Sequence, residues 1–201
     1  MARPVELNFD FPAHFEVTVL ERIDRMPEVQ RVLSFPDALR VDSQRELSAG
    51  VILAVRAAEA KPWIGIFESY AYGSPPAAPR QVFGWPDGRS LCFVGGGGGC
   101  VVRTDEPTQT FEIDCFPICD VLVVPDRQLV VFADFTALIA YGRHGVVWRS
   151  KRLALDELTI LSAEDDTLHV SGFFGGSHHD SFDVDLRTGE QTGAPREFDY
   201  Y

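Results

Sequence analysis

The stretch VLVVPDRQLVVFADFTALIAYGRHGVVWRS, residues 121–150, decides the fold. Short runs of β-branched and aromatic residues alternate in it with turn residues such as Pro-Asp-Arg-Gln at 125–128 and Gly-Arg-His-Gly at 142–145. Runs of this length between tight turns predict four antiparallel strands in a meander. The second and third runs, 129–133 and 137–141, are apolar at consecutive positions. We therefore expect both of their faces to be buried.

Similar patterns flank this stretch on both sides. Strand-like runs occur at Gln81–Trp85, Leu91–Val94, Cys100–Thr104, Thr110–Ile113, Leu158–Ser162, Thr167–Phe173 and Ser181–Leu186. The runs fall into three similar units, and in each unit the second run has a leucine at or next to its first residue. These leucines, Leu91, Leu129 and Leu168, are 38 and then 39 residues apart. A four-strand unit at about that spacing is typical of propeller blades. We therefore expect the three leucines to occupy equivalent places in successive sheets.

The N-terminal part of the chain has a weaker pattern of the same kind. Strand-like runs occur at Glu16–Leu20, Val51–Val55 and Trp63–Glu68. The more polar segment 21–49 could form a short helix around Pro27–Leu33, because proline is tolerated in a first helical turn. The sequence thus predicts one all-β domain over residues 1–201, made of consecutive antiparallel meanders in three to four propeller-like units, with residues 1–49 more polar and partly helical. A β-sandwich is the alternative fold.

Several segments between Leu129 and Gly193 carry a resemblance to known proteins. They are VFADFT at 131–136, AYG at 140–142, GVVWRS at 145–150, RLALD at 152–156 and FDVDLRTG at 182–189. They resemble an uncharacterised family of bacterial β-rich proteins with propeller-blade-like repeats, although Leu155 and Glu157 stand where that pattern has an aromatic residue and a glycine. The last segment is also similar to a blade of quinoprotein-type propellers, which show Asp-x-x-Thr-Gly, but it lacks the tryptophan expected after that glycine. The resemblance implies a fold and no activity.

The net charge of −12 is unevenly distributed along the chain. Residues 1–100 contain 12 acidic and 10 basic residues, whereas residues 101–201 contain 18 and 8. An acidic C-terminal half repels phosphate, so the charge argues against nucleic acid and anionic lipid as partners. It is compatible with a basic protein partner or simply with solubility.

Two groups of residues are candidates for binding such a partner. Asp183 and Asp185 are two residues apart on a predicted strand, so both carboxylates lie on one face of it. Tyr70, Tyr72 and Trp85 lie near a proline-rich loop and could form an exposed aromatic patch. Aromatic residues without basic neighbours suit a protein partner better than RNA.

The histidine-rich segment near the C-terminus is the candidate for catalytic chemistry. His178-His179-Asp180 follows a pair of glycines, and His169 lies on the strand before them. Imidazole and carboxylate groups suit zinc, so a metal-assisted hydrolase is the alternative function. Adjacent residues of an extended chain point to opposite sides, however, and no nucleophile, base and orienting group occur together. The sequence therefore favours a non-catalytic protein-interaction module without a cofactor.

The glycine run Gly95–Gly99 is followed by a strand rather than by the Lys-Ser/Thr and helix of a phosphate loop. It predicts a hairpin connection, where glycine accepts a positive φ.

The cellular compartment is predicted from the N-terminus and the cysteines. No basic region followed by an apolar run begins the chain, and no apolar run approaches the ~20 residues that span a bilayer. We therefore expect a cytoplasmic protein whose four cysteines, Cys92, Cys100, Cys115 and Cys119, are thiols. Their spacing lacks the two-residue knuckles of zinc sites. The oligomeric state stays open.

Overall fold

The structure, a computed structural model, divides the chain into two compact units. It describes residues 5–22, 29, 31–35, 39–40, 50–58, 60–68, 79–176 and 178–192. Unit 1 consists of residues 1–72 and 80–114, and unit 2 consists of residues 73–79 and 115–201. The single domain over residues 1–201 stays a prediction.

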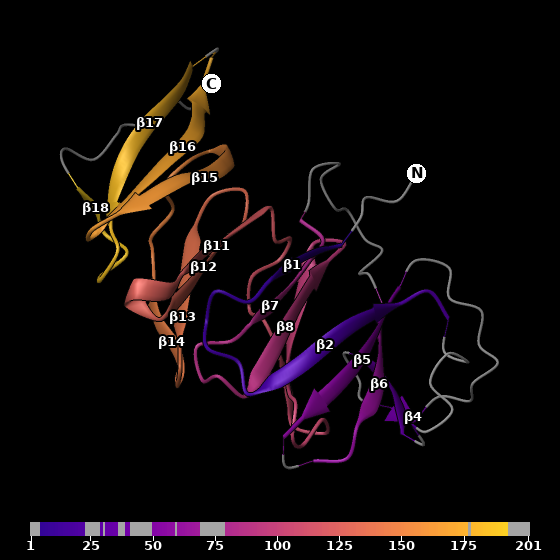
Figure 1. The fold of residues 1–201 in the computed structure, drawn as a ribbon. Coiled ribbons are helices and arrows are strands. Elements are labelled where there is room, and N and C mark those ends of the chain that lie inside the picture. Colours follow the sequence, from indigo (N-terminus) through magenta and orange to yellow (C-terminus); the bar gives the residue numbers. More distant parts are fainter. Residues whose placement is uncertain are drawn as a thin grey trace. The chain divides into compact units, whose positions relative to one another are not determined.

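Unit 1 contains two five-stranded sheets (Figure 1). The first has the order β1-β7-β8-β9-β10, with strands Glu6–Asn8, Gln81–Gly84, Ser90–Gly95, Gly98–Arg103 and Thr110–Glu112. The second has the order β2-β5-β6-β3-β4, with strands Phe15–Leu20, Val51–Ala57, Trp63–Phe67, Val32–Phe35 and Leu39–Arg40. Neighbouring strands are antiparallel except for β1 with β7 and β3 with β6, which are parallel.

Unit 2 contains two four-stranded antiparallel sheets, each in sequence order. The first consists of β11 (Asp120–Val124), β12 (Leu129–Ala133), β13 (Leu138–Gly142) and β14 (Gly145–Arg149). A 3-10 turn over Pro125–Arg127 joins β11 to β12. The second consists of β15 (Asp156–Glu164), β16 (Thr167–Gly175), β17 (His178–Asp185) and β18 (Gln191–Thr192). The meander predicted over residues 121–150 is confirmed strand by strand.

The prediction of an all-β chain of consecutive, mainly antiparallel sheets is confirmed, and the part of the chain that the structure describes contains no α-helix. The predicted helix around Pro27–Leu33 is wrong at its C-terminal end, because Val32 and Leu33 belong to β3. Residues 27, 28 and 30 lie outside the described residues. β3 pairs with β6, and Leu33 is buried. A pairing partner some 30 residues away in sequence thus overrides a local helix signal.

The three repeated leucines lie at matching positions of three second strands. Leu91 of β8 pairs with Gly84, the last residue of β7, and Leu129 of β12 pairs with Val124, the last residue of β11. Leu168 of β16 pairs with Ala163, the last residue but one of β15. All three leucines are buried. The register therefore agrees with the predicted repeat.

Two glycines of the run Gly95–Gly99 form the tight turn between β8 and β9. Gly95 pairs with Gly98, and the two residues between them, Gly96 and Gly97, have φ values of 64° and 83°. A two-residue hairpin turn with positive φ at both positions matches the twist of the strands, and glycine adopts it without steric cost. The predicted hairpin connection is confirmed.

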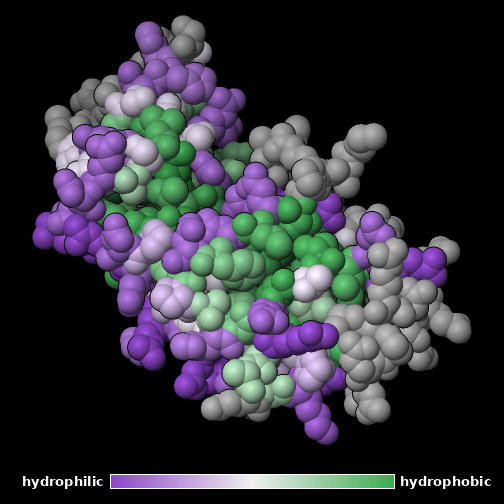
Figure 2. Space-filling view, in the orientation of Figure 1, coloured by the Kyte–Doolittle hydropathy of each residue, from purple (hydrophilic) through white to green (hydrophobic). Residues whose placement is uncertain are grey.

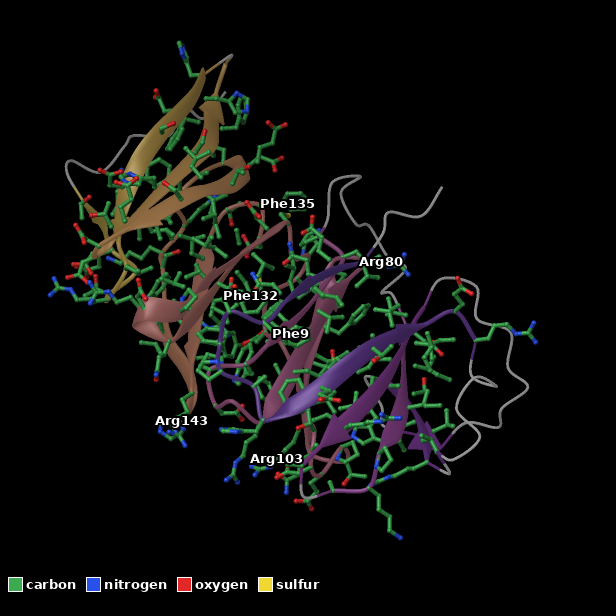
Figure 3. The ribbon with its side chains drawn as sticks, viewed as in Figure 1. Phe9, Arg80, Arg103, Phe132, Phe135 and Arg143 are labelled. Atoms are coloured by element: carbon green, nitrogen blue, oxygen red, sulfur yellow. The ribbon has the colours of Figure 1, made fainter. Side chains whose placement is uncertain are left out.

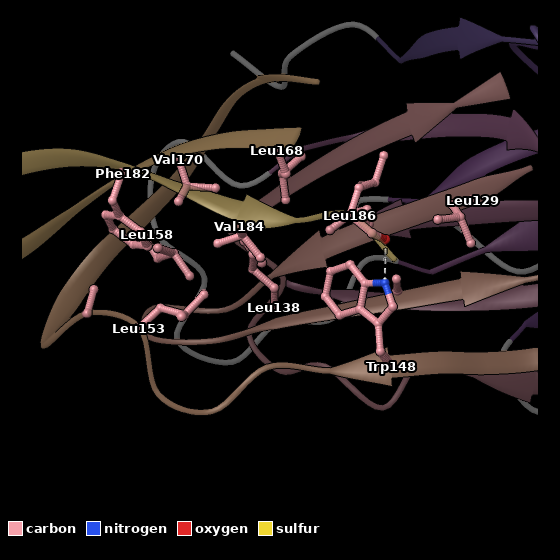
Figure 4. Packing of buried hydrophobic residues seen from close by; sticks show 14 of the residues in the cluster. Leu129, Leu138, Trp148, Leu153, Leu158, Leu168, Val170, Phe182, Val184 and Leu186 are labelled. Carbon is pink, nitrogen blue, oxygen red and sulfur yellow. Dashed lines mark hydrogen bonds between the residues drawn. The ribbon is translucent and has the colours of Figure 1, made fainter. Parts of the chain in front are cut away.

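The core of unit 2 is formed between its two sheets around Trp148 (Figure 4). The indole Nε1 of Trp148, on β14, donates a hydrogen bond of 2.7 Å to the carbonyl oxygen of Leu186, directly after β17. The indole ring lies against Gly189, where an added Cβ would come within 2.4 Å of ring atom Cε3. Gly189 also has a φ of +74°. Both sterics and backbone conformation thus require glycine at this turn.

A second tryptophan joins the two sheets of unit 1 in a comparable way. The indole Nε1 of Trp63, at the start of β6, donates a hydrogen bond of 2.8 Å to the carbonyl oxygen of Thr104, directly after β9. Trp63 is buried, and its ring packs near Phe35 at a centroid distance of 5.6 Å. In each unit, the acceptor is therefore the first residue after the third strand of an antiparallel meander.

Substitution Gly189→Ala should destabilise the chain by about 2–4 kcal/mol, because the methyl group collides with the Trp148 ring and the backbone has a left-handed conformation. The matched control is Gly145→Ala: Gly145 also has a positive φ, but an added Cβ meets nothing within 4 Å. Its loss should be about 1–2 kcal/mol, from the backbone alone. Urea unfolding followed by tryptophan fluorescence measures both losses. Equal losses would show that the contact with Trp148 contributes nothing.

Candidate interaction site

The histidines predicted as metal ligands form separate pairs with carboxylates in the structure. His169 on β16 lies directly opposite Asp183 on β17, and its Nδ1 is 2.7 Å from Asp183 Oδ1. His179 on β17 has its Nε2 2.6 Å from Glu157 Oε2. Each side chain of the two pairs is about a third exposed or more, so water screens the charges and the contribution of each pair to stability is small.

The pair His179–Glu157 depends on an irregularity of β15. The register between β15 and β16 shifts between Asp156 and Thr159, and Glu157 in this bulge has a φ of 54°. The bulge directs the Glu157 carboxylate to His179, whose ring also lies 5.4 Å from that of Phe173. His178, the preceding residue, pairs with Gly175 in the strand register.

The four candidate ligands therefore do not converge on one point. His178 and His179 are consecutive residues of β17, and Asp180 follows them opposite Gly172. Within the described residues, no three or more His, Cys, Asp and Glu side chains are grouped so that they could hold a metal ion. A catalytic zinc normally takes three protein ligands, and the described residues do not bring three of these candidates together.

The carboxylates predicted to bind a partner are also engaged within unit 2. Asp183 contacts His169, as described above. Asp185 accepts a hydrogen bond of 3.1 Å from Arg187 Nη2 and one of 2.7 Å from the Arg187 backbone N–H. The side-chain hydrogen bond from Arg187 lowers the pKa of Asp185 below its ordinary value. The charge of Asp185 is thus partly neutralised by its own neighbour.

The prediction that Trp85 belongs to an exposed aromatic patch is wrong. This residue is only 2% exposed and lies edge-on to Phe111 at a centroid distance of 5.8 Å. Its ring belongs to the core of unit 1, because the turn after β7 folds it inward rather than toward solvent. Tyr70 and Tyr72 lie outside the described residues.

The negative charges of three aspartates that the sequence did not single out act on the thiol of Cys119 in unit 2. The thiol is half-buried, and desolvation raises its pKa to about 11, helped by the negative charges of Asp134, Asp156 and Asp120. The Cys119 backbone N–H also donates a hydrogen bond of 2.8 Å to the carbonyl oxygen of Ala133. Three segments distant in sequence are therefore joined at one end of unit 2: the start of β11, the end of β12 and the start of β15.

Backbone hydrogen bonds hold these three carboxylates in place, and Asp156 accepts one of 2.7 Å from the Glu157 N–H. Asp120 accepts bonds from the N–H groups of Val121 and Ile160, at 2.8 and 2.9 Å. Asp134 accepts bonds from the N–H groups of Thr136 and Ala137, at 2.6 and 2.8 Å. Burial raises the pKa of Asp120 above its ordinary value in spite of its hydrogen bonds. Uncharged donors orient a carboxylate without neutralising it.

No arginine or lysine among the described residues forms an ion pair with Asp120, Asp134 or Asp156. The opposite end of unit 2 differs in this respect. There, Arg127 Nη2 lies 2.8 Å from Asp166 Oδ1, and Arg187 lies near the same aspartate. The acidic surplus of the C-terminal half is thus compensated at one end of its sheets and uncompensated at the other.

Two exposed phenylalanines accompany the uncompensated carboxylates. Phe116 is 57% exposed and precedes Cys119 by three residues. Phe135, labelled in Figure 3, is 37% exposed and follows Asp134. The carbonyl oxygen of Phe135 accepts a hydrogen bond of 3.1 Å from the Leu158 N–H, which keeps this loop beside the start of β15. Green hydrophobic residues lie among purple hydrophilic ones on the face shown in Figure 2. We call Phe116, Asp120, Asp134, Phe135 and Asp156 the acidic aromatic site.

Comparisons with known proteins add little to this description. No protein-family model and no curated protein matches the chain. A solved structure, "Crystal structure of HIRA(644-1017)", is similar to it with a TM-score of 0.36 and 13% identity. The alignment covers 92% of this chain and 54% of that one, so the chain spans about half of its length.

A TM-score this low defines neither fold nor function, so the class of the protein follows from its own sheets. It is an all-β protein of consecutive, mainly antiparallel sheets. None of the part that the structure describes forms a helix with the length and hydrophobicity needed to cross a membrane.

The thiol of Cys119 provides a test of this site in the folded protein. Because its pKa is raised to about 11, the thiolate is scarce at pH 8, and a disulfide reagent should react about 100-fold more slowly than with an ordinary thiol. Asp134→Asn or Asp156→Asn should lower the pKa and speed the reaction, whereas Asp183→Asn should not change it. Cys92 and Cys100 are buried, and desolvation raises both of their pKa values, so they should stay silent until unfolding.

The same measurement in denaturant should recover four reactive thiols, since the structure shows all four cysteines as free. Equal rates for the Asp134→Asn and Asp183→Asn variants would contradict the arrangement around Cys119.

Proposed function

We propose that this chain is a non-catalytic protein-interaction module, and that its acidic aromatic site binds a basic segment of a partner protein. The observation that carries the proposal is the exposure of Phe135, which follows Asp134, and of Phe116, three residues before Cys119, in a part of unit 2 whose carboxylates Asp120, Asp134 and Asp156 pair with no described arginine or lysine. Exposed aromatic residues are the usual anchors of protein interfaces. The carboxylates Asp120, Asp134 and Asp156 would select lysine or arginine on the partner.

The chemistry of the site favours arginine and lysine in particular. Carboxylates held by backbone N–H groups keep free lone pairs for a guanidinium group, which binds them with charge-assisted hydrogen bonds. A cation above an aromatic face gains about 0.5–1 kcal/mol at an exposed position. Phe116 and Phe135 can supply such faces next to the carboxylates. Long-range attraction by unneutralised charge also speeds association with a basic partner.

The proposal moves the partner-binding surface away from Asp183 and Asp185. Those two side chains contact His169 and Arg187, so a partner would have to replace existing contacts before it gained new ones. Asp134 and Asp156 require no such exchange. The two pairs of aspartates thus serve as matched test and control within unit 2.

We also propose that the sheets are successive blades of a propeller. This is supported by the sequence order of the meanders in unit 2, by the matching positions of Leu91, Leu129 and Leu168, and by the tryptophan hydrogen bonds that join the sheets in each unit. A resemblance to bacterial β-rich proteins with blade-like repeats agrees with it. A crystal structure in which the sheets face each other in two layers would instead support a β-sandwich.

The interaction is tested with a labelled peptide of alternating arginine and glycine and a control peptide in which glutamate replaces arginine. We expect only the basic peptide to bind. Its affinity should fall as salt rises, because the screening length decreases to about 8 Å at physiological ionic strength. The double variant Asp134→Asn/Asp156→Asn should weaken binding about tenfold, whereas Asp183→Asn/Asp185→Asn should change it less than about twofold. Fluorescence anisotropy measures both effects.

A further variant, Phe116→Ala, separates the apolar from the electrostatic contribution. It should weaken binding at all salt concentrations alike. If both aspartate double variants lose affinity equally, the C-terminal half attracts the peptide only by its overall charge and the proposed site is wrong.

A further inference from the structure

Unit 1 contains a small hollow, with both polar and apolar lining residues, beside the turn that joins β7 to β8. Its volume is about 180 Å³, and it is lined by His14, Ala57, Ala58, Arg89, Thr104 and Asp105. A second hollow of about 460 Å³ shares His14, Ala57 and Ala58 with it. The first hollow is large enough for one small polar group.

The backbone of Arg89 is held firmly at the edge of this hollow. Its N–H donates a hydrogen bond of 2.8 Å to Asp87 Oδ1. Its carbonyl oxygen accepts one bond of 2.9 Å from the Thr104 N–H and one of 2.6 Å from Thr104 Oγ1. Thr104 is only 2% exposed, so these bonds are shielded from water. The base of the Arg89 side chain is thus fixed in position by three hydrogen bonds.

His14 is held beside Arg89 by a close contact with the same turn. The His14 N–H donates a hydrogen bond of 2.9 Å to the carbonyl oxygen of Gly88, which has a φ of +70°. A Cβ at Gly88 would lie 2.9 Å from the Pro12 carbonyl oxygen and 3.4 Å from the His14 ring. Only glycine therefore allows the segment 12–14 to approach this closely and to place the imidazole over the turn.

Among the residues that the structure describes, the side-chain donor groups of Arg89 and His14 have no acceptor. The Arg89 guanidinium and the His14 ring form no hydrogen bond or ion pair with the residues that the structure describes. The nearby carboxylate of Asp105 is already engaged, since Arg103 Nε and Nη2 donate bonds of 2.7 and 3.2 Å to it. The hydrogen bond from Arg103 lowers the pKa of Asp105, and the charges of Arg103 and, to a smaller extent, Arg89 contribute to the same shift. Figure 3 labels Arg103 at the end of β9.

We propose that this hollow binds an oxyanion, the phosphate or carboxylate group of a small molecule, between the Arg89 guanidinium and the His14 imidazole. Arginine binds planar and tetrahedral oxyanions through its fork of N–H donors, and an imidazole N–H adds a further donor. The larger adjoining hollow gives room for the remainder of the molecule.

The Trp63 indole provides a built-in reporter for the test. Its N–H donates to the carbonyl oxygen of Thr104, so a ligand at Thr104 should shift the indole resonance. Inorganic phosphate and, separately, acetate are titrated into the ¹⁵N-labelled full chain. We expect saturable shifts of the Arg89 and Thr104 amides and of the Trp63 indole with at least one of the two anions. Tighter binding of phosphate would assign the site to phosphate groups, and tighter binding of acetate to carboxylates.

Two variants test the assigned donors against a matched control. Arg89→Ala should weaken anion binding about tenfold or more, and its fold should persist because the side chain makes no bond to described residues. His14→Gln is the second variant and should weaken binding severalfold. Arg143→Ala, at the β13–β14 turn of unit 2 (Figure 3), should leave binding unchanged. Linear shifts without saturation, or equal affinities of the wild type and both variants at the hollow, would overturn the proposal.

Discussion

A hydrogen bond from a buried indole to a backbone carbonyl joins the two sheets of each unit, and much of the surrounding structure depends on it. An indole N–H left unpaired in a core costs about 1–3 kcal/mol, so the neighbouring sheet must present an acceptor at one place. Thr104 and Leu186 present it directly after β9 and β17. The turns that follow these residues are positioned by the same bond. In unit 1, Thr104 transmits this constraint to Arg89 through its own two hydrogen bonds.

The strands were largely predictable, because the signals that define them are local. Within residues 121–150, turn residues separate β-branched runs, and the period of the pattern is enough to place four strands. The end of the expected helix at Leu33 was not predictable in the same way. The feature that makes it a strand is the pairing of β3 with β6, and no property of residues 27–33 reveals that partner. Trp85 likewise lies at the end of a strand-like run, and it contacts Phe111 from a later strand, which the local pattern does not reveal.

The candidate site was harder to predict than the fold, because its residues are dispersed. Asp120, Asp134 and Asp156 each lie at the edge of a strand-like run, where polar residues are common and carry little information. They meet at Cys119 only through the pairing of β11 with β12 and the contact of β11 with β15. The net charge correctly indicated that the C-terminal half is acidic. Composition does not show, however, which carboxylates arginines neutralise, such as Asp166 and Asp185, and which ones only backbone N–H groups contact. The sequence signal that could have indicated this site is the occurrence of two aromatic residues, Phe116 and Phe135, at loop positions.

Strand β8 has a consequence for how this chain selects one structure. All six of its residues, Ser90–Gly95, are buried, so both faces of the strand are covered. Where one face meets water, a slip of one residue exposes apolar side chains and is strongly penalised. In β8 such a slip exchanges one apolar environment for another, and the hydrophobic pattern alone hardly distinguishes the two alignments. The information that selects between them lies in the length and handedness of the turn at Gly96 and Gly97. A run of glycines, usually regarded as the least informative kind of sequence, thus determines which residues of a fully covered sheet face each other.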